Sequence, residues 1–181
     1  MTRKFDIKQW LAEHPAEEHF KHQILDKNPS KVLCDLGIRA GHVVLDFGCG
    51  SGTYTIPAAK LVGNSGKVYA LDINSSFLDR MEERAKQEGL TNIVRIDASG
   101  EESLPLETGV IDVILIDVLH IIEKRDALFD DAYRILKPEG LLIVYPMHVD
   151  EQEVEELATH SNLAPEARRL QERFFVFRKS S

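Results

Sequence analysis

The stretch VVLDFGCGSGTYTIPAAKLVG, residues 43–63, passes from a short apolar run through three closely spaced glycines into a helix-like pattern. Glycine reaches backbone angles closed to other residues and lets a ligand lie against the main chain. The N-terminus of a following helix offers unpaired N–H groups to an anion. A glycine-rich turn between a strand and a helix therefore predicts a site for a nucleotide or a nucleotide-like ligand.

Composition bounds the class of protein. The chain has 181 residues, 43% of them hydrophobic, which predicts a single globular domain. The net charge of −8 disfavours a broad nucleic-acid surface, which needs clustered Lys and Arg. The two cysteines, Cys34 and Cys49, do not suffice for a disulfide framework or a cysteine-rich zinc site. No apolar run approaches the length of a membrane span, so we expect a cytoplasmic protein without membrane contact.

After residue 40, strand-like and helix-like segments alternate. We expect strands at 42–47, 66–73, 92–98, 110–118 and 141–147, and helices at 53–63, 75–89, 124–140 and 150–161, followed by two strands around a tight turn in 166–179. Ser75 or Ser76 is the expected cap of the second of these helices, and Pro138 with Gly140 the expected end of the third. Such alternation predicts a parallel α/β sheet with helices on both faces, whose ligand lies beyond the carboxyl ends of the strands.

The first 40 residues are polar and helix-like. Apolar residues recur at helical spacing in 6–14 and 15–25, and Asn28 and Gly37 bracket a short helix. We expect residues 1–40 to form a helical cap on an α/β core of residues 41–181, within one domain. Trp10 and Phe20, with His14 and His22, are suited either to cover a ligand or to pack against the flank of the sheet.

The spacing of the glycines reduces the number of ligand classes that the loop could bind. It reads G-x-G-x-G, one residue shorter than the dinucleotide motif G-x-G-x-x-G. Asp46, two residues before the first glycine, would repel a pyrophosphate but suits a ligand that carries an ammonium group. S-adenosylmethionine offers both that ammonium group and a carboxylate for the N–H groups.

Two further acids end the next two strands. Asp72, 20 residues after Gly52 (72 − 52), suits the ribose hydroxyls of either NAD or S-adenosylmethionine. Asp97 suits the amino group of an adenine. A single acid at a strand end often caps a helix, but three around one glycine turn favour an adenosine ligand.

Five segments in this order, VVLDFGCGSG, KVYALDIN, RIDASGEESLP, VIDVILIDVLHII and AYRILKPEGLLIV, resemble class I S-adenosylmethionine-dependent methyltransferases, in particular the small enzymes related to quinone biosynthesis. The resemblance spans roughly residues 28–147. It implies a Rossmann-like seven-stranded sheet, mostly parallel, with an antiparallel C-terminal hairpin, and S-adenosyl-L-methionine as the cofactor. The sequence departs from the family in having little material after the fifth strand for an inserted substrate cap, so the resemblance does not imply where the substrate pocket lies. The resemblance implies a cofactor site made of Asp46, Gly48, Cys49, Gly50, Gly52, Asp72, Ile73, Asp97, Ala98, Asp117 and Val118.

Methyl transfer is an in-line displacement that depends mainly on positioning. A general base is needed only for a nucleophile that must lose a proton. His120 and His148, just after the fourth and fifth strands, are the catalytic candidates, although loop histidines also form purely local hydrogen bonds. Tyr54 is placed either to gate the pocket or to pack.

Other chemistries are weaker. His14, His19 and His22 lack a further ligand, so an exposed polar helix is favoured and no metal site is predicted. The fourth strand is followed by VLHI and not by the Asn-Pro-Pro-Tyr segment with which amino-methylating DNA and RNA enzymes hold a base. Nucleobase amines are therefore disfavoured as methyl acceptors. The basic stretch of Arg168, Arg169, Arg173, Arg178 and Lys179 indicates a solvated hairpin, with contact to an anionic substrate or RNA as the minor alternative.

The sequence therefore predicts an enzyme that methylates a small molecule. A non-catalytic module that binds S-adenosylmethionine is the second class, and a nicotinamide-dependent oxidoreductase the third. A homodimer is left open.

Overall fold

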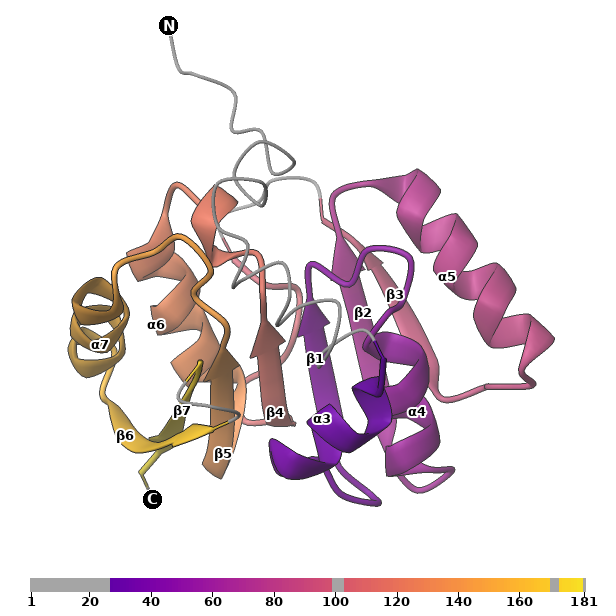
Figure 1. The fold of residues 1–181 in the computed structure, drawn as a ribbon, viewed down its shortest axis with the longest axis horizontal. Coiled ribbons are helices and arrows are strands. Elements are labelled where there is room, and N and C mark those ends of the chain that lie inside the picture. Colours follow the sequence, from indigo (N-terminus) through magenta and orange to yellow (C-terminus); the bar gives the residue numbers. More distant parts are fainter. Residues whose placement is uncertain (1–26, 99–102, 170–172, 181) are drawn as a thin grey trace, which may run out of the picture.

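The computed structural model describes residues 27–98, 103–169 and 173–180, with the side chain of Arg169 left out (Figure 1). The helices expected at 6–14 and 15–25, with Trp10, Phe20 and the three N-terminal histidines, lie outside the described residues.

Strands and helices alternate as expected from Asn28 onward. The order is α3 (Pro29–Asp35), β1 (Val43–Phe47), α4 (Thr55–Val62), β2 (Lys67–Asp72), α5 (Ser75–Gln87), β3 (Ile93–Asp97), β4 (Ile111–Ile116), a 3-10 helix η2 (Leu119–Ile121), α6 (Arg125–Ile135), β5 (Leu136–Val144), α7 (Glu151–His160), β6 (Leu163–Arg169) and β7 (Phe174–Lys179).

These strands form one seven-stranded sheet in the order β3-β2-β1-β4-β5-β7-β6 (Figure 1). The first five strands of that order pair in parallel, and β7 runs antiparallel to both β5 and β6. The predicted fold class is confirmed, including the antiparallel hairpin. The strand order reverses between β1 and β4, which is where parallel α/β sheets bind ligands.

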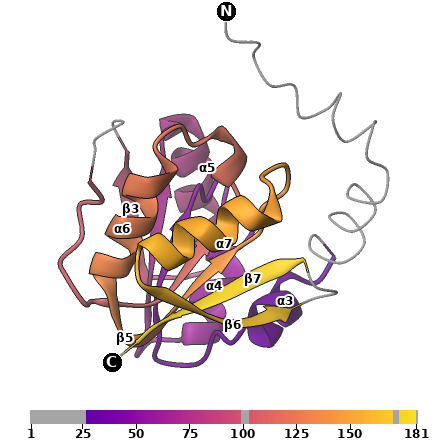
Figure 2. The ribbon, with the colours of Figure 1, turned by 90° about the vertical axis from the view of Figure 1, so that its left-hand side faces the viewer.

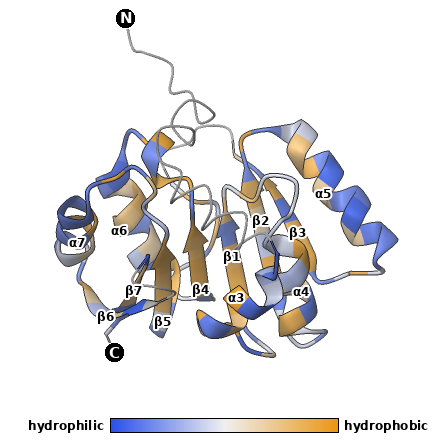
Figure 3. Ribbon diagram, in the orientation of Figure 1, coloured by the Kyte–Doolittle hydropathy of each residue, from blue (hydrophilic) through white to orange (hydrophobic). Residues whose placement is uncertain are grey.

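Helices cover both faces of the sheet. One buried cluster joins α6 and α7 to the sheet, and another joins α3 and α4 to the opposite face. In Figure 2, α6 and α3 accordingly lie on opposite sides of the strands. Figure 3 shows mostly apolar strands, with α5 and α7 largely hydrophilic. None of the described helices has the length and apolar character needed to cross a bilayer.

Two expected boundaries are wrong. The cap of α5 is Asn74, whose side chain accepts a hydrogen bond from Ser76 N at 3.1 Å, and not Ser75 or Ser76. Asn caps as well as Ser, and here the Ser75 hydroxyl donates instead to Asp97. The identity of the cap was decided by this contact with a distant residue.

The end of α6 also differs. The helix stops at Ile135, and Leu136 already pairs with Ile111 of β4. Pro138 disfavours helical angles at the residue before it, and Gly140 has Lys137 O only 2.9 Å from where a Cβ would be. The segment 137–140 is therefore a bulge at the start of β5.

The core depends strongly on Phe129 of α6, whose side chain is fully buried. We expect Phe129→Ala to lower the free energy of unfolding by about 3–5 kcal/mol, because it removes apolar contacts and leaves a cavity. The matched control is Phe77→Ala, since Phe77 is 38% exposed; its cost should stay below about 1 kcal/mol. Urea unfolding followed by circular dichroism measures both, and equal losses would contradict this assignment of the core.

Candidate active site at the carboxyl edge of the sheet

A cleft of about 430 Å³ opens at the carboxyl ends of the parallel strands. Its walls come from the segments that follow β1, β2, β3 and β4 and from the first turns of α6. Six of the predicted cofactor residues line it: Gly48, Asp72, Ile73, Asp97, Ala98 and Val118. Asp46 and Asp117 line a smaller cavity instead, together with Tyr54.

The glycine loop is fixed to the end of β2. Gly48 N and Cys49 N both donate to Leu71 O, at 2.8 and 3.0 Å. Gly50 N donates to one carboxylate oxygen of Asp72 at 2.8 Å, and Asn74 N donates to the other at 2.9 Å. A carboxylate has about four acceptor positions, so Asp72 can accept further hydrogen bonds in the cleft that it lines.

Two glycines of the loop are required for different reasons. Gly48 has φ +83, and a Cβ there would lie 2.5 Å from Cγ2 of Val118, so any side chain would push β1 and β4 apart. Gly50 has φ +53, and no described atom lies within 4 Å of a Cβ built there. The first glycine therefore permits close packing, while the second leaves open space where a side chain would lie.

Asp46 is buried at the end of β1, with 3% of its surface exposed. The hydroxyl of Thr55, the first residue of α4, donates to it at 2.5 Å. Burial raises the pKa of Asp46 to about 7; the bond from Thr55 opposes this rise, and the charges of Asp117 and Asp72 add to it. Asp46 therefore titrates near neutrality.

Cys49 and Tyr54 are suited to packing. Burial raises the pKa of the Cys49 thiol to about 12, so the thiol stays protonated. Tyr54 packs against the cluster beneath α3 and α4, which favours the packing role over gating.

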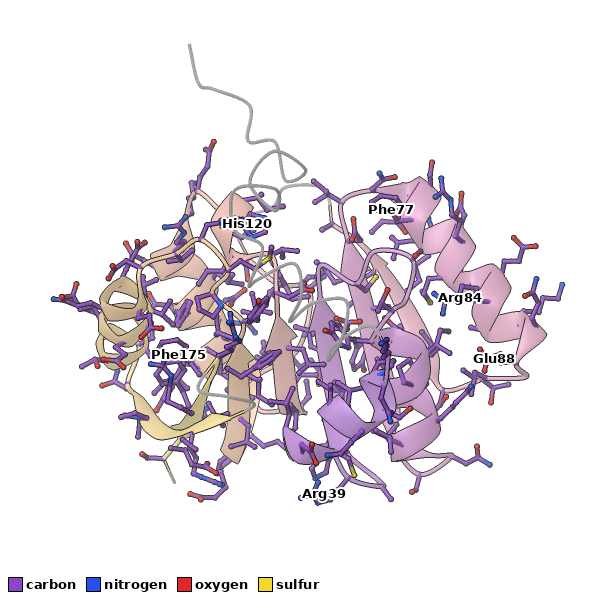
Figure 4. All side chains as sticks on the ribbon, viewed as in Figure 1. Arg39, Phe77, Arg84, Glu88, His120 and Phe175 are labelled. Atoms are coloured by element: carbon purple, nitrogen blue, oxygen red, sulfur yellow. The ribbon has the colours of Figure 1, made fainter. Side chains whose placement is uncertain are left out.

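The two candidate catalytic histidines meet in space. His120 lies in η2 after β4, and His148 lies in the loop after β5; their ring centroids are 5.0 Å apart in an edge-to-face arrangement. Figure 4 shows His120 at the carboxyl edge of the sheet. The described residues lining the larger cleft include Ile121, the neighbour of His120, but neither histidine.

Arg125 connects η2, which carries His120, to helix α7. Its Nε donates to Leu119 O at 3.2 Å, and its guanidinium pairs with Glu153 of α7. The basic residues of the hairpin are also engaged locally: Arg168 pairs with Glu151 and Glu155, and Lys179 donates to backbone carbonyls. These contacts favour the prediction of a solvated hairpin over an anion-binding patch.

Sequence reasoning missed the partners of the acids. Thr55 follows Asp46 by nine residues, and no sequence pattern announced their contact. Arg95 donates to both oxygens of Asp97. Its signal was available, because residues two apart in a strand share one face.

Comparison with known proteins agrees with this geometry. The family model described as a methyltransferase domain matches residues 38–173. The ubiquinone/menaquinone biosynthesis C-methyltransferase of Marinomonas sp. is 34% identical over 156 residues, 85% of this chain and 59% of that protein. The enzyme of the same name from Pasteurella multocida is 35% identical over 60% of this chain and 41% of its own length. The matches thus cover 41% to 59% of the length of these two relatives.

Among solved structures, an S-adenosylmethionine-dependent methyltransferase from Aquifex aeolicus superposes with a TM-score of 0.73. The two share 23% identity, and the match covers 97% of this chain and 98% of that one. At that identity the likeness concerns the fold alone.

The family match, on a chain with this seven-stranded sheet, identifies a class I S-adenosylmethionine-dependent methyltransferase domain. This chain belongs to the methyltransferase-domain family, and the predicted family and its cofactor, S-adenosyl-L-methionine, are confirmed.

Asp46 provides a test of the electrostatics. A carboxyl whose folded-state pKa lies near 7 and whose unfolded-state pKa lies near 3.8 keeps its proton longer in the folded chain, so it destabilises the fold as pH rises between those values. The effect is about 1.4 kcal/mol per pH unit at most.

We expect Asp46→Asn to gain stability relative to the wild type as pH rises from 4 to 7, because the amide cannot ionise. Urea unfolding at several pH values measures the difference. Thr55→Val, which removes the hydrogen bond and keeps the carboxyl, should retain the pH dependence. A pH-independent difference between Asp46→Asn and the wild type would contradict the raised pKa.

Proposed function

We propose that this protein transfers the methyl group of S-adenosyl-L-methionine to a small, largely apolar acceptor, at a ring carbon of a quinone precursor. The observation that carries the proposal is the cleft of about 430 Å³ in which Asp72, Asp97 and Gly48 face one space. That volume suits an adenosine group together with a neighbouring small molecule. The Marinomonas and Pasteurella relatives, whose names state C-methylation in quinone biosynthesis, support the class of acceptor.

On the cofactor side, Asp72 accepts hydrogen bonds from the ribose hydroxyls, and Asp97 with Ala98 binds the adenine. Asp46, Gly48, Cys49, Gly50 and Gly52 surround the methionine part of the cofactor. Asp117 and Val118 lie beside the methyl group. Asp46 is buried beside this loop, where a cationic ligand would stabilise its charged form.

When bound, the cofactor supplies a methyl group already activated by the sulfonium. The chain aligns acceptor and methyl group and excludes water. A ring carbon that gains the methyl group must lose its hydrogen as a proton. We propose that the pair of His120 and His148 accepts this proton on an imidazole nitrogen.

Calorimetric titration with S-adenosylhomocysteine tests the cofactor. We expect micromolar binding by the wild type and binding at least about tenfold weaker in Asp72→Ala, because charge-assisted hydrogen bonds to the ribose are lost. Asp35→Ala, which removes an exposed carboxylate of α3, should bind like the wild type. Preference for NADH over S-adenosylhomocysteine would overturn the proposal in favour of an oxidoreductase.

Methyl transfer to a short-chain prenylated naphthoquinol that lacks the ring methyl group tests the histidines. We expect His120→Gln or His148→Gln to lower kcat by about 10²-fold or more and to remove the acidic limb of the pH profile. The affinity for S-adenosylhomocysteine should be unchanged. His160→Gln is the control at the exposed end of α7. Unchanged kcat in both variants would exclude the proton-transfer role. A folded protein that binds S-adenosylhomocysteine but methylates no acceptor would favour the non-catalytic module.

A further inference from the structure

Arg95 of β3 carries a dense set of hydrogen bonds at the cleft. Its Nε and Nη2 donate to the two oxygens of Asp97, at 2.6 and 2.8 Å. Its Nη1 donates to Asp79 at 2.7 Å and to Glu82 at 2.9 Å, both on α5. The fork-shaped guanidinium thus fixes a carboxylate at the end of its own strand and ties it to the neighbouring helix.

Asp97 is fixed by its hydrogen bonds but can still accept another one. Arg95 and the Ser75 hydroxyl occupy three of its roughly four acceptor positions. Its side chain is 52% exposed and lines the cleft beside Ala98 and Ile73. The hydrogen bonds from Arg95, and then that from Ser75, hold the pKa of Asp97 below its usual range, so the group stays a carboxylate at neutral pH. One acceptor position is therefore left for a ligand in the cleft that Asp97 lines.

A second acid makes this arrangement necessary. Asp97 pairs in register with Asp72 of β2, so two carboxylates end adjacent strands. Like charges on neighbouring strands repel each other. Arg95 offsets the charge of Asp97, whereas Asp72 is stabilised by the backbone N–H groups of Gly50 and Asn74. Without Arg95, the Ser75 hydroxyl would be the one described side-chain donor left to hold Asp97 beside Asp72.

We propose that Arg95 is a positioning residue that sets selectivity for adenine, by holding the Asp97 carboxylate where it accepts a hydrogen bond from the 6-amino group of the base. This inference rests on the proposed cofactor site. Arg95 itself does not contact the base; it acts through the orientation of Asp97.

The test compares two ligands, S-adenosylhomocysteine and its analogue with hydrogen in place of the adenine 6-amino group. We expect the wild type to bind the first about tenfold more tightly, the usual effect of a hydrogen bond to a charged group. Arg95→Gln should reduce this preference to about twofold or less, mainly by weakening the binding of S-adenosylhomocysteine. Asp97→Ala should have the same effect.

Two further variants make the result specific. Arg95→Lys keeps the positive charge but cannot donate two parallel hydrogen bonds to Asp97. It should therefore also lose the preference for S-adenosylhomocysteine over the analogue. Because the charge is kept, this variant guards against a general folding defect. Arg80→Gln is the matched control, because this substitution removes the same charge from a neighbouring helix. Arg80 lies on α5, over the ring of Phe77. It should retain the wild-type preference.

The outcomes separate the two proposals. Equal weakening of both ligands in Arg95→Gln and Arg95→Lys would overturn the positioning role and leave Arg95 as a structural residue. A wild type that binds both ligands equally would overturn it as well, while the proposed function would stand. Failure of the folded wild type to bind either ligand would instead refute the proposed function.

Discussion

The carbonyl oxygen of Leu71 accepts hydrogen bonds from both Gly48 N and Cys49 N, and the active-site edge depends on this joint. The last register pair of β1 and β2 is Phe47 with Leu71. These two hydrogen bonds therefore extend the contact between the two strands into the glycine loop. The backbone then turns away from the sheet against Val118, at the end of β4. Three adjacent strands are thereby held close enough to share one cleft, and a side chain at Gly48 would break this arrangement.

Holding strand ends so close concentrates negative charge, and the fold stabilises each acid differently. Asp46 is buried and titrates near neutrality beside the Thr55 hydroxyl. Asp72 accepts backbone N–H groups from the loop that it supports. Asp97 is paired with Arg95. An edge of this kind suits a ligand that carries positive charge and many hydrogen-bond donors, as S-adenosylmethionine does.

Much of the fold could be predicted from the sequence because its signals are local. Apolar runs, helix caps and glycines gave the order of strands and helices from Asn28 onward, and the acids at successive strand ends indicated the ligand edge. The two wrong helix boundaries concern single residues, but contacts with residues distant in the sequence caused them. Ser75 does not cap α5 because its hydroxyl bonds to Asp97, and α6 stops before Leu136 because that residue pairs with β4.

The sequence by itself determined the class of fold and the glycine loop, since both follow from residue types at fixed spacing along the chain, and the resemblance of five segments to known enzymes indicated the family. Only the tertiary structure decided which side chains meet. It brought His120 within ring contact of His148, set Thr55 against Asp46 and tied Arg95 to α5. These contacts depend on the crossing of separate strands and helices, whose packing sets distances and burial, and hence pKa values, that residue spacing along a chain does not contain.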